Sequence, residues 1–246
     1  DPDPNPHQVV HGGGPKAGPV TVSVEDSSQF ASALLLSSRV GGWDVSTPEG
    51  ANPDELPYVE MTRAMVRVFP HGGGTFQIEP DASSASYFHA VNALFPAVAP
   101  VRVMACQDTK ADGGSGWQID AEFPRHTPRA AGAAAVGSAG AEHVVSRHAP
   151  TDLGDSVMTA IAIAPLSTVP CRFTNLGVLR KQECERVEAL RTELTKCGAS
   201  VVEEGDNLSV ACTAAAQLGS ATVHTYHDHR MAMCFATLGL AVGGIK

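Results

Sequence analysis

The sequence predicts an α/β protein assembled from repeated units in which helices and strands alternate. Amphipathic helical patterns, with apolar residues three and four positions apart, recur along the chain between short runs that alternate like strands. A helix, a glycine and a strand follow one another near residues 58–79 and again near 183–204. Such internal repetition indicates a fold made from one repeated supersecondary unit.

The first third of the chain predicts a strand, two helices and a second strand. Residues 20–24 alternate like a strand, and the polar segment 26–30 then begins a helix that runs to about residue 36. Residues 57–69 form a second amphipathic pattern, which a run of glycines ends, and residues 75–79 predict a strand. Residues 1–19 show no periodicity, so we expect a poorly ordered start.

The middle of the chain predicts two more helices with a weaker pattern between them. A proline and helix-capping residues at 79–81 precede a helix over residues 84–95. Residues 128–141 are rich in Ala and Gly and predict either a short helix or a low-complexity loop. The segment from residue 151 opens another helix, which is apolar through residue 166.

The last third carries the clearest patterns. Residues 172–176 predict a strand, and residues 183–197 predict an amphipathic helix that stops at Gly198. Residues 199–203 and 207–212 predict a hairpin around the Gly-Asp pair between them.

Composition and charge argue against a nucleic-acid-binding, membrane-spanning or disulfide-rich protein. The formal net charge of -9 argues against nucleic acid or an anionic membrane surface as a partner. No apolar run reaches the roughly 20 residues that span a bilayer, and the polar, proline-rich start has no signal-peptide core. The six cysteines form no Cys-x-x-Cys pair and are expected to be reduced thiols in a cytoplasmic protein.

The stretch TYHDHRMAMCFATLGL, residues 225–240, places a charged cluster directly before an apolar helix. Asp228 is the expected N-cap, and Arg230 stands in the first turn, where the helix dipole disfavours a cation unless an anionic ligand is present. Two other interpretations stay open: a cap with polar neighbours, or a zinc site made by His224, His227 and His229, which lacks a usual completing ligand.

Basic residues gather in one region of this acidic chain, at Arg180, Lys181, Arg186, Arg191 and Lys196, with Arg230 further on. A local basic site suits a small anionic substrate. The alternative is a solvated helix face, above all for Arg191 and Lys196.

Three segments carry a family resemblance: SSQF at 27–30, DASSASYF at 81–88 and DHRMAM at 228–233. In this order they resemble the 5-enolpyruvylshikimate-3-phosphate (EPSP) synthases, the 3-phosphoshikimate 1-carboxyvinyltransferases. The resemblance implies a two-lobe enolpyruvyl-transferase fold built from repeated βαβαββ units. It divides the chain into a partial, incomplete first lobe, residues 1–79, and a second lobe, residues 80–246, with a hinge near 79–81.

The family transfers the enolpyruvyl group of phosphoenolpyruvate to the 5-hydroxyl of shikimate 3-phosphate and releases phosphate, in the shikimate pathway to aromatic amino acids. The resemblance implies these two small molecules as substrates, with no metal and no cofactor. The chemistry needs a base for the hydroxyl, an acid for the methylene carbon and cations for the phosphates and the carboxylate.

The resemblance also implies roles for particular residues. Asp155, in DLGDSVMT, matches the catalytic base, although an N-cap role is also open. Glu183 matches an acid–base residue of the family. A Glu in the first turn of a helix is nearly as good an interpretation. Arg186 and Arg230 match arginines that bind phosphoenolpyruvate. The remaining matches are to residues that contact shikimate 3-phosphate: Ser27, Ser28, Gln29, Tyr58 and Gln182. Gln29 also matches a residue that touches phosphoenolpyruvate.

Several positions depart from the family pattern. Gln182 stands where the family commonly has a substrate-binding lysine, and Lys181 beside it is a candidate replacement. Val178 stands where many members have an asparagine, and Glu55 where many have a serine that binds the phosphate.

The chain also lacks the family's N-terminal segment and its last C-terminal segment. A truncated domain that is catalytically impaired and binds anions or a complementing N-terminal segment is therefore an alternative function. An enzyme that transfers enolpyruvate to a UDP-sugar is a further one, against which DASSASYF and DHRMAM argue.

Overall fold

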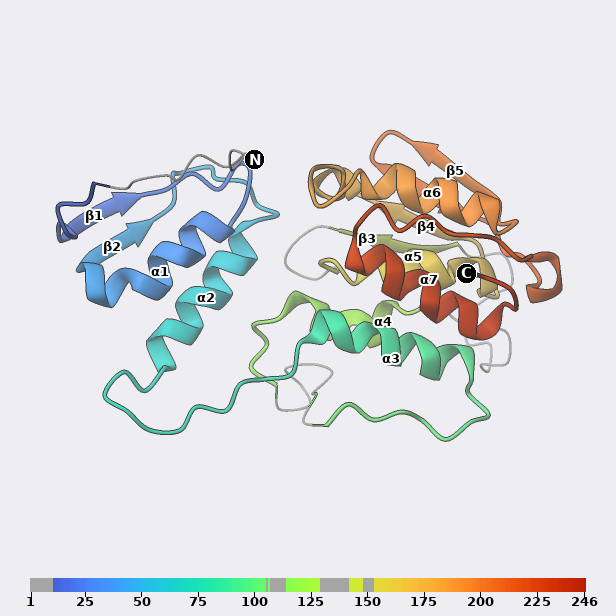
Figure 1. Ribbon diagram of the computed structural model, residues 1–246, viewed down its shortest axis with the longest axis horizontal. Helices are drawn as coiled ribbons and strands as arrows, with labels where there is room; N and C mark the ends of the chain where they lie inside the picture. Colours follow the sequence, from blue (N-terminus) through green and yellow to red (C-terminus); the bar gives the residue numbers. More distant parts are fainter. Residues whose placement is uncertain (1–10, 105, 107–113, 129–141, 148–152) are drawn as a thin grey trace, which may run out of the picture. The chain divides into compact units, whose positions relative to one another are not determined.

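The computed structural model describes residues 11–104, 106, 114–128, 142–147 and 153–246. The chain divides into two compact units, Asp1–His71 and Gly72–Lys246 (Figure 1). The expected helix or loop at 128–141 and the start of the helix expected from residue 151 lie largely outside the described residues. No helix within the described ranges is both long and apolar enough to cross a membrane.

The first unit is a small βαβ arrangement followed by one more helix. Strand β1 (Gly18–Thr21) pairs in parallel with β2 (Trp43–Ser46), and helix α1 (Gln29–Gly41) connects them. Gly42, at φ 67°, takes the left-handed conformation that ends α1. Helix α2 (Leu56–Val68) packs beside α1. The core of this unit consists of six buried apolar residues: Val24, Ala31, Leu35, Val45, Ala51 and Val59.

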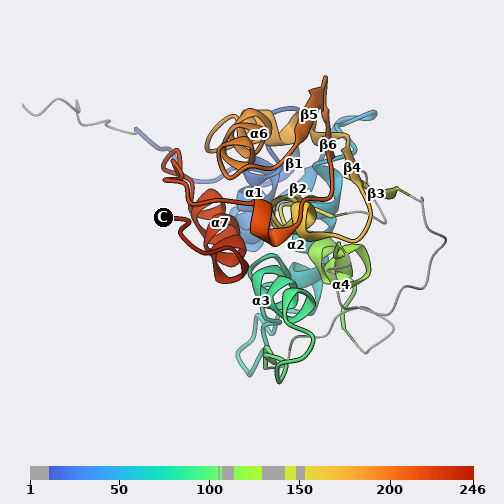
Figure 2. The ribbon, with the colours of Figure 1, turned by 90° about the vertical axis from the view of Figure 1, so that its right-hand side faces the viewer.

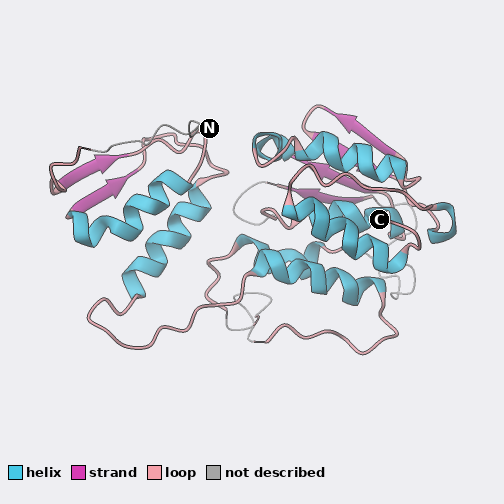
Figure 3. Cartoon of the chain, in the orientation of Figure 1, coloured by secondary structure: helices cyan, strands magenta, loops and turns pink. Residues whose placement is uncertain are grey.

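The second unit contains a four-stranded sheet in the order β3-β4-β6-β5. Strand β3 (His143–Ser146) is parallel to β4 (Cys171–Thr174), whereas β6 (Asn207–Val210) is antiparallel to both β4 and β5 (Val201–Glu204). Buried and half-exposed residues alternate along β4 and β6, because only one face of the sheet is covered. Figure 3 marks these strands in magenta.

The described part of the second unit also contains five α-helices, and Figure 2 shows α6 and α7 on the same side of the sheet. All seven residues of α5 are buried, so this helix forms the centre of the core, where α7 packs against it. The cysteines 171, 197 and 234 belong to the same core. The helices are α3 (Ala82–Leu94), α4 (Phe123–His126), α5 (Val157–Ile163), α6 (Arg186–Lys196) and α7 (His229–Ala241).

Two expected elements differ from the structure. Residues 75–79 are not a strand, since the ladder partner that a strand needs is not supplied by the neighbouring described segments. Helix α6 begins at Arg186 rather than at 183, because the Glu185 side chain accepts from the N–H of Glu188 and acts as the N-cap. The hairpin of β5 and β6 is confirmed.

The division between the units falls between His71 and Gly72, ahead of the segment 79–81. The Glu79 carboxylate accepts from the Ser115 N–H at 2.7 Å and from its hydroxyl at 2.8 Å, and also from Gln118. Burial opposes ionisation of Glu79, but these hydrogen bonds outweigh it and lower its pKa. Glu79 is therefore hydrogen-bonded within the second unit. Hinge motion at residues 79–81 stays a prediction.

Candidate functional site

The N-terminus of α7 is built as the sequence predicted. Asp228 is the N-cap, and its Oδ1 accepts from the backbone N–H of Arg230 at 2.7 Å. Tyr226 and His227 precede it with φ near 55° and 56°, the left-handed region that non-glycine residues adopt rarely. This turn directs the chain into α7 and brings the carboxylate of Asp228 into the interior, where 1% of the residue is exposed.

Arg186 and Asp228 form a buried ion pair between the first turns of α6 and α7. Arg186 Nε lies 2.7 Å from Asp228 Oδ2, and Nη2 donates to Oδ1 at 3.4 Å. Neither side chain is exposed. Burial opposes ionisation of Asp228, but the hydrogen bond and charge of Arg186 outweigh it and hold its pKa below the ordinary value.

Asp155 lies immediately before α5, with a fifth of its side chain exposed. Its Oδ2 lies 3.1 Å from Arg230 Nε, and its Oδ1 accepts from Gln182 Nε2 at 3.3 Å. Arg186 Nη1 is 3.7 Å from the same Oδ1. The N-cap position of α5 belongs to Ser156, so the Asp155 side chain is turned to the arginines instead of capping the helix.

Asp120, which sequence reasoning did not select, supports the segment that carries Asp155. Its Oδ1 accepts from the Gly154 N–H at 2.7 Å and from the Ser156 hydroxyl, and its Oδ2 accepts from the Ser83 hydroxyl. Burial raises the pKa of Asp120, although these hydrogen bonds oppose the rise. No local pattern marks it, because its partners are 34 to 37 residues away in sequence.

Arg186 has its donors engaged within the chain. Besides Asp228, it binds Glu183 Oε2 at 2.6 Å through Nη2, and Nη1 donates to Gln182 Oε1. The Glu183 side chain is about half exposed. Lys181 is exposed, and it is the Gln182 amide that reaches Asp155, so the chain does not shift by one residue to put Lys181 there.

Tyr87, in the DASSASYF segment on α3, is a second residue that the sequence did not single out. Its hydroxyl interacts with the Arg230 guanidinium, and this interaction favours the charged form of each group. Burial, with the nearby Cys234 thiol, raises the pKa of Tyr87 to about 12. Arg230 keeps its charge, because the Asp155 carboxylate outweighs the effect of burial and raises the pKa of Arg230.

The other predicted binding residues belong to the first unit. Ser28 is the N-cap of α1, and its N–H donates to Glu55 Oε2 at 2.8 Å in a buried contact. Ser27 Oγ accepts from the Gln29 N–H at 3.1 Å. Tyr58 lies on α2, which packs beside α1. Glu55, an anion where many members of the resembled family have a phosphate-binding serine, therefore points at the N-terminus of α1.

The basic cluster seen in the sequence separates in space. Arg180 pairs with Glu203 and Asp206 at 2.8 Å each and also with Glu185, and it ties the β5–β6 hairpin to the segment before α6. Arg191 lies 2.8 Å from Glu203, and Lys196 lies 2.7 Å from Glu193. Of the six basic residues, Arg186 and Arg230 are the ones that face Asp155.

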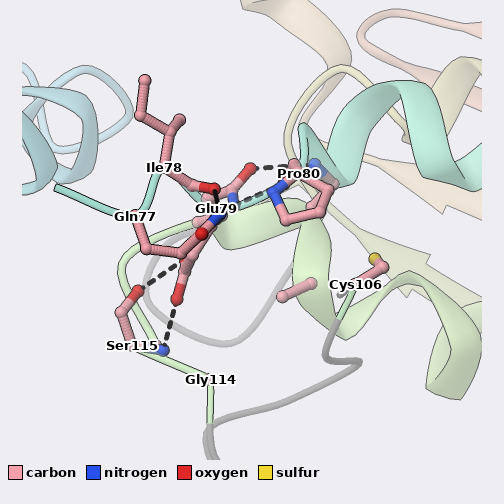
Figure 4. A pocket seen from close by; sticks show the side chains of 11 residues that line it. Gln77, Ile78, Glu79, Pro80, Cys106, Gly114 and Ser115 are labelled. Carbon is pink, nitrogen blue, oxygen red and sulfur yellow. Dashed lines mark hydrogen bonds between the residues drawn. The ribbon is translucent and has the colours of Figure 1, made fainter. Parts of the chain in front are cut away.

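A pocket of about 270 Å³ lies beside the start of the second unit, and none of the described residues lining it is one of the arginines around Asp155 (Figure 4). Glu79 and Ser115 meet at its wall. Among the described residues, no group of three or more His, Cys, Asp or Glu side chains is close enough to hold a metal ion.

Guanidinium groups near helix starts can bind small anions, and a carboxylate held beside them can accept a proton. Similarity to known proteins identifies the family. The family model for EPSP synthase (3-phosphoshikimate 1-carboxyvinyltransferase) matches residues 70–246, and the chain belongs to this family.

Relatives with the name 3-phosphoshikimate 1-carboxyvinyltransferase cover nearly the whole chain. The protein of Pseudomonas syringae pv. syringae is 30% identical over 95% of this chain and 56% of its own length. The protein of Bordetella parapertussis is 31% identical over 93% of this chain and 58% of its own length. This chain therefore spans a little over half the length of these relatives.

The solved structure of EPSP synthase from Acinetobacter baumannii has the same fold, with a TM-score of 0.54 and 16% sequence identity. The match covers 94% of this chain and 58% of that chain. The two-lobe enolpyruvyl-transferase architecture expected from the sequence is thereby confirmed.

Proposed function

We propose that this chain takes part in the transfer of the enolpyruvyl group of phosphoenolpyruvate to the 5-hydroxyl of shikimate 3-phosphate, with release of phosphate. The observation that carries the proposal is the position of Asp155, which lies 3.1 Å from Arg230 and 3.7 Å from Arg186. A proton acceptor and two anion-binding groups are therefore within one small region. The names of the relatives favour this substrate pair over a UDP-sugar.

In this mechanism the hydroxyl oxygen bonds to C2 of phosphoenolpyruvate while Asp155 accepts the hydroxyl proton, and a proton is added to the methylene carbon. The tetrahedral intermediate then loses phosphate and a methyl proton, which restores the double bond. Glu183 is the proposed acid–base partner, since its half-exposed carboxylate can turn between Arg186 and solvent. Arg186 and Arg230 hold the phosphate and carboxylate charges.

We assign the acceptor substrate to the first unit. Ser27 and Ser28 at the start of α1 are the proposed contacts to its phosphate, and Gln29 is proposed to touch both substrates. Tyr58 is proposed beside the ring, and Gln182 is a further proposed contact to shikimate 3-phosphate. Residues 79–81 are the proposed hinge between the two lobes. Because the relatives are longer, a complementing N-terminal segment is the proposed partner that completes the first lobe.

A second candidate is a catalytically impaired domain that binds anions or the complementing segment. Two observations favour it. Arg186 is fully buried with its donors engaged inside the chain, and Gln182 cannot donate a proton as a lysine does.

Phosphate release from the two substrates, measured for this chain alone and mixed with the N-terminal segment of a relative, separates the candidates. Turnover in either sample supports the transferase. Anion binding by calorimetry without turnover in both samples supports the impaired domain.

A further inference from the structure

Arg147 is a buried arginine directly after β3 whose hydrogen bonding is incomplete. Its backbone N–H donates to the Thr174 carbonyl at 2.9 Å, which continues the parallel pairing of β3 with β4 by one residue. The side chain is 4% exposed. Arg147 thus stands at the carboxyl ends of two parallel strands, the place where α/β sheets bind their ligands.

One nitrogen of the Arg147 guanidinium, Nε, lacks an acceptor among the described residues. Its Nε is buried with no hydrogen-bond partner. Its Nη2 lies 3.9 Å from Asp155 Oδ1, which is beyond hydrogen-bond length. Arginine does not lose its proton in proteins, so burial cannot be relieved by neutralisation. A buried donor of this kind in a native structure calls for an explanation, and an acceptor beyond the described residues is one.

The neighbouring carboxylates are already occupied. Asp155 accepts from Gln182 through Oδ1 and pairs with Arg230 through Oδ2. Asp228 is bound to Arg186 and also caps α7. Arg147, Arg186 and Arg230 all approach the single carboxylate of Asp155, so Asp155 is shared among three arginines.

We propose that Arg147 is a third anion-binding residue of this site, donating from its Nε edge to a carboxylate or phosphate oxygen of the ligand. The proposal deepens the function given above and rests on it. An arginine suits the role because its planar fork binds either oxyanion through two parallel hydrogen bonds.

Nuclear magnetic resonance of the arginine Nε–H groups in the full chain tests this directly. Through-bond experiments assign the Arg147 signal in the unsubstituted protein, so the test does not depend on a variant that folds. Inorganic phosphate is titrated in one sample and pyruvate in another. We expect a saturable shift of the Arg147 signal, and the sample in which it occurs identifies phosphate or carboxylate as the bound group. A signal that stays in place in both samples overturns the proposal.

Calorimetry with the same two anions gives an independent measurement. Arg147→Lys keeps the charge but removes the Nε edge, and we expect the affinity to fall about tenfold or more. Arg172→Gln is the matched control, since Arg172 lies on the neighbouring β4, 37% exposed and 3.8 Å from Glu204. We expect its anion affinity to be unchanged.

Arg230→Ala distinguishes the two ways of failing. If it weakens binding while Arg147→Lys does not, Arg147 is structural and the proposed function stands. If neither substitution changes anion binding, both the assignment of the anion site and the role of Arg147 are wrong.

Discussion

Gln182 joins Asp155 to Arg186: its Nε2 donates to Asp155 Oδ1 at 3.3 Å, and its Oε1 accepts from Arg186 Nη1. One uncharged side chain therefore links the proposed base to a buried arginine. The lysine common in the resembled family cannot accept a hydrogen bond, so it would leave Arg186 Nη1 free and place a cation opposite Asp155. This contact makes residue 182 the position that most directly sets the charge of the site.

Gln182→Lys should increase turnover, because it adds a proton donor and releases a donor of Arg186 for the substrate. The measurement is phosphate release in the presence of the complementing segment. The double variant Lys181→Gln/Gln182→Lys keeps the net charge and serves as the control for a general charge effect. Equal or lower turnover in both variants would contradict the role given to residue 182.

Asp155→Asn should lower kcat by at least about 10²-fold while leaving KM nearly unchanged, because a proton acceptor acts mainly in the transition state. Ser156 holds the N-cap position of α5, so the helix should still form, and the melting temperature should fall only through the loss of the ion pair with Arg230. Steady-state kinetics and thermal unfolding are measured together. Turnover at the original rate would assign the base to another residue.

Asp228→Asn should destabilise the second unit by about 3–5 kcal/mol, since it leaves Arg186 buried without its partner. Asparagine is also a good N-cap, so the loss reports the charge and not the cap. Urea unfolding at pH 7 measures it. A loss below about 1 kcal/mol, the range of exposed pairs, would show that the pair is not effectively buried.

The stabilisation that Asp228 provides should depend on pH, and the direction of this dependence follows from its lowered pKa. The pKa of Asp228 is lowered in the folded protein, so its contribution is present above the unfolded value of about 3.9 and is lost as the pH falls through the folded value. The stability difference between the unsubstituted protein and Asp228→Asn should therefore shrink below about pH 4. A difference that grows on acidification would contradict the ion pair.

Glu55→Ser should strengthen the binding of shikimate 3-phosphate, because the Glu55 carboxylate now accepts from the Ser28 N–H at the start of α1. Removing it frees that donor for a phosphate. Glu60→Ser is the matched control: Glu60 also lies on α2, is 62% exposed and pairs with Arg63. Calorimetry should show a gain in affinity for the first variant alone. No gain would place the phosphate elsewhere.

Local pattern predicted the longer elements, and the family resemblance predicted part of the site. The helices at 56–68, 82–94, 186–196 and 229–241 and the β5–β6 hairpin follow from periodicity, caps and a Gly-Asp turn, all of which act within a few residues. The family resemblance pointed to Asp155, Arg186 and Arg230, which the structure brings together.

Only the tertiary structure decided which charges share one environment. Strands β2 and β3 are four residues long and are defined by parallel partners distant in sequence. No local hydrophobic period therefore predicts them. Arg180 and Arg186 are close in sequence, yet one binds the hairpin acids and the other is buried against Asp228. Arg147 stands apart from them in sequence and nevertheless approaches Asp155. Burial and ion pairing depend on distances through space, and chain folding alone sets those distances.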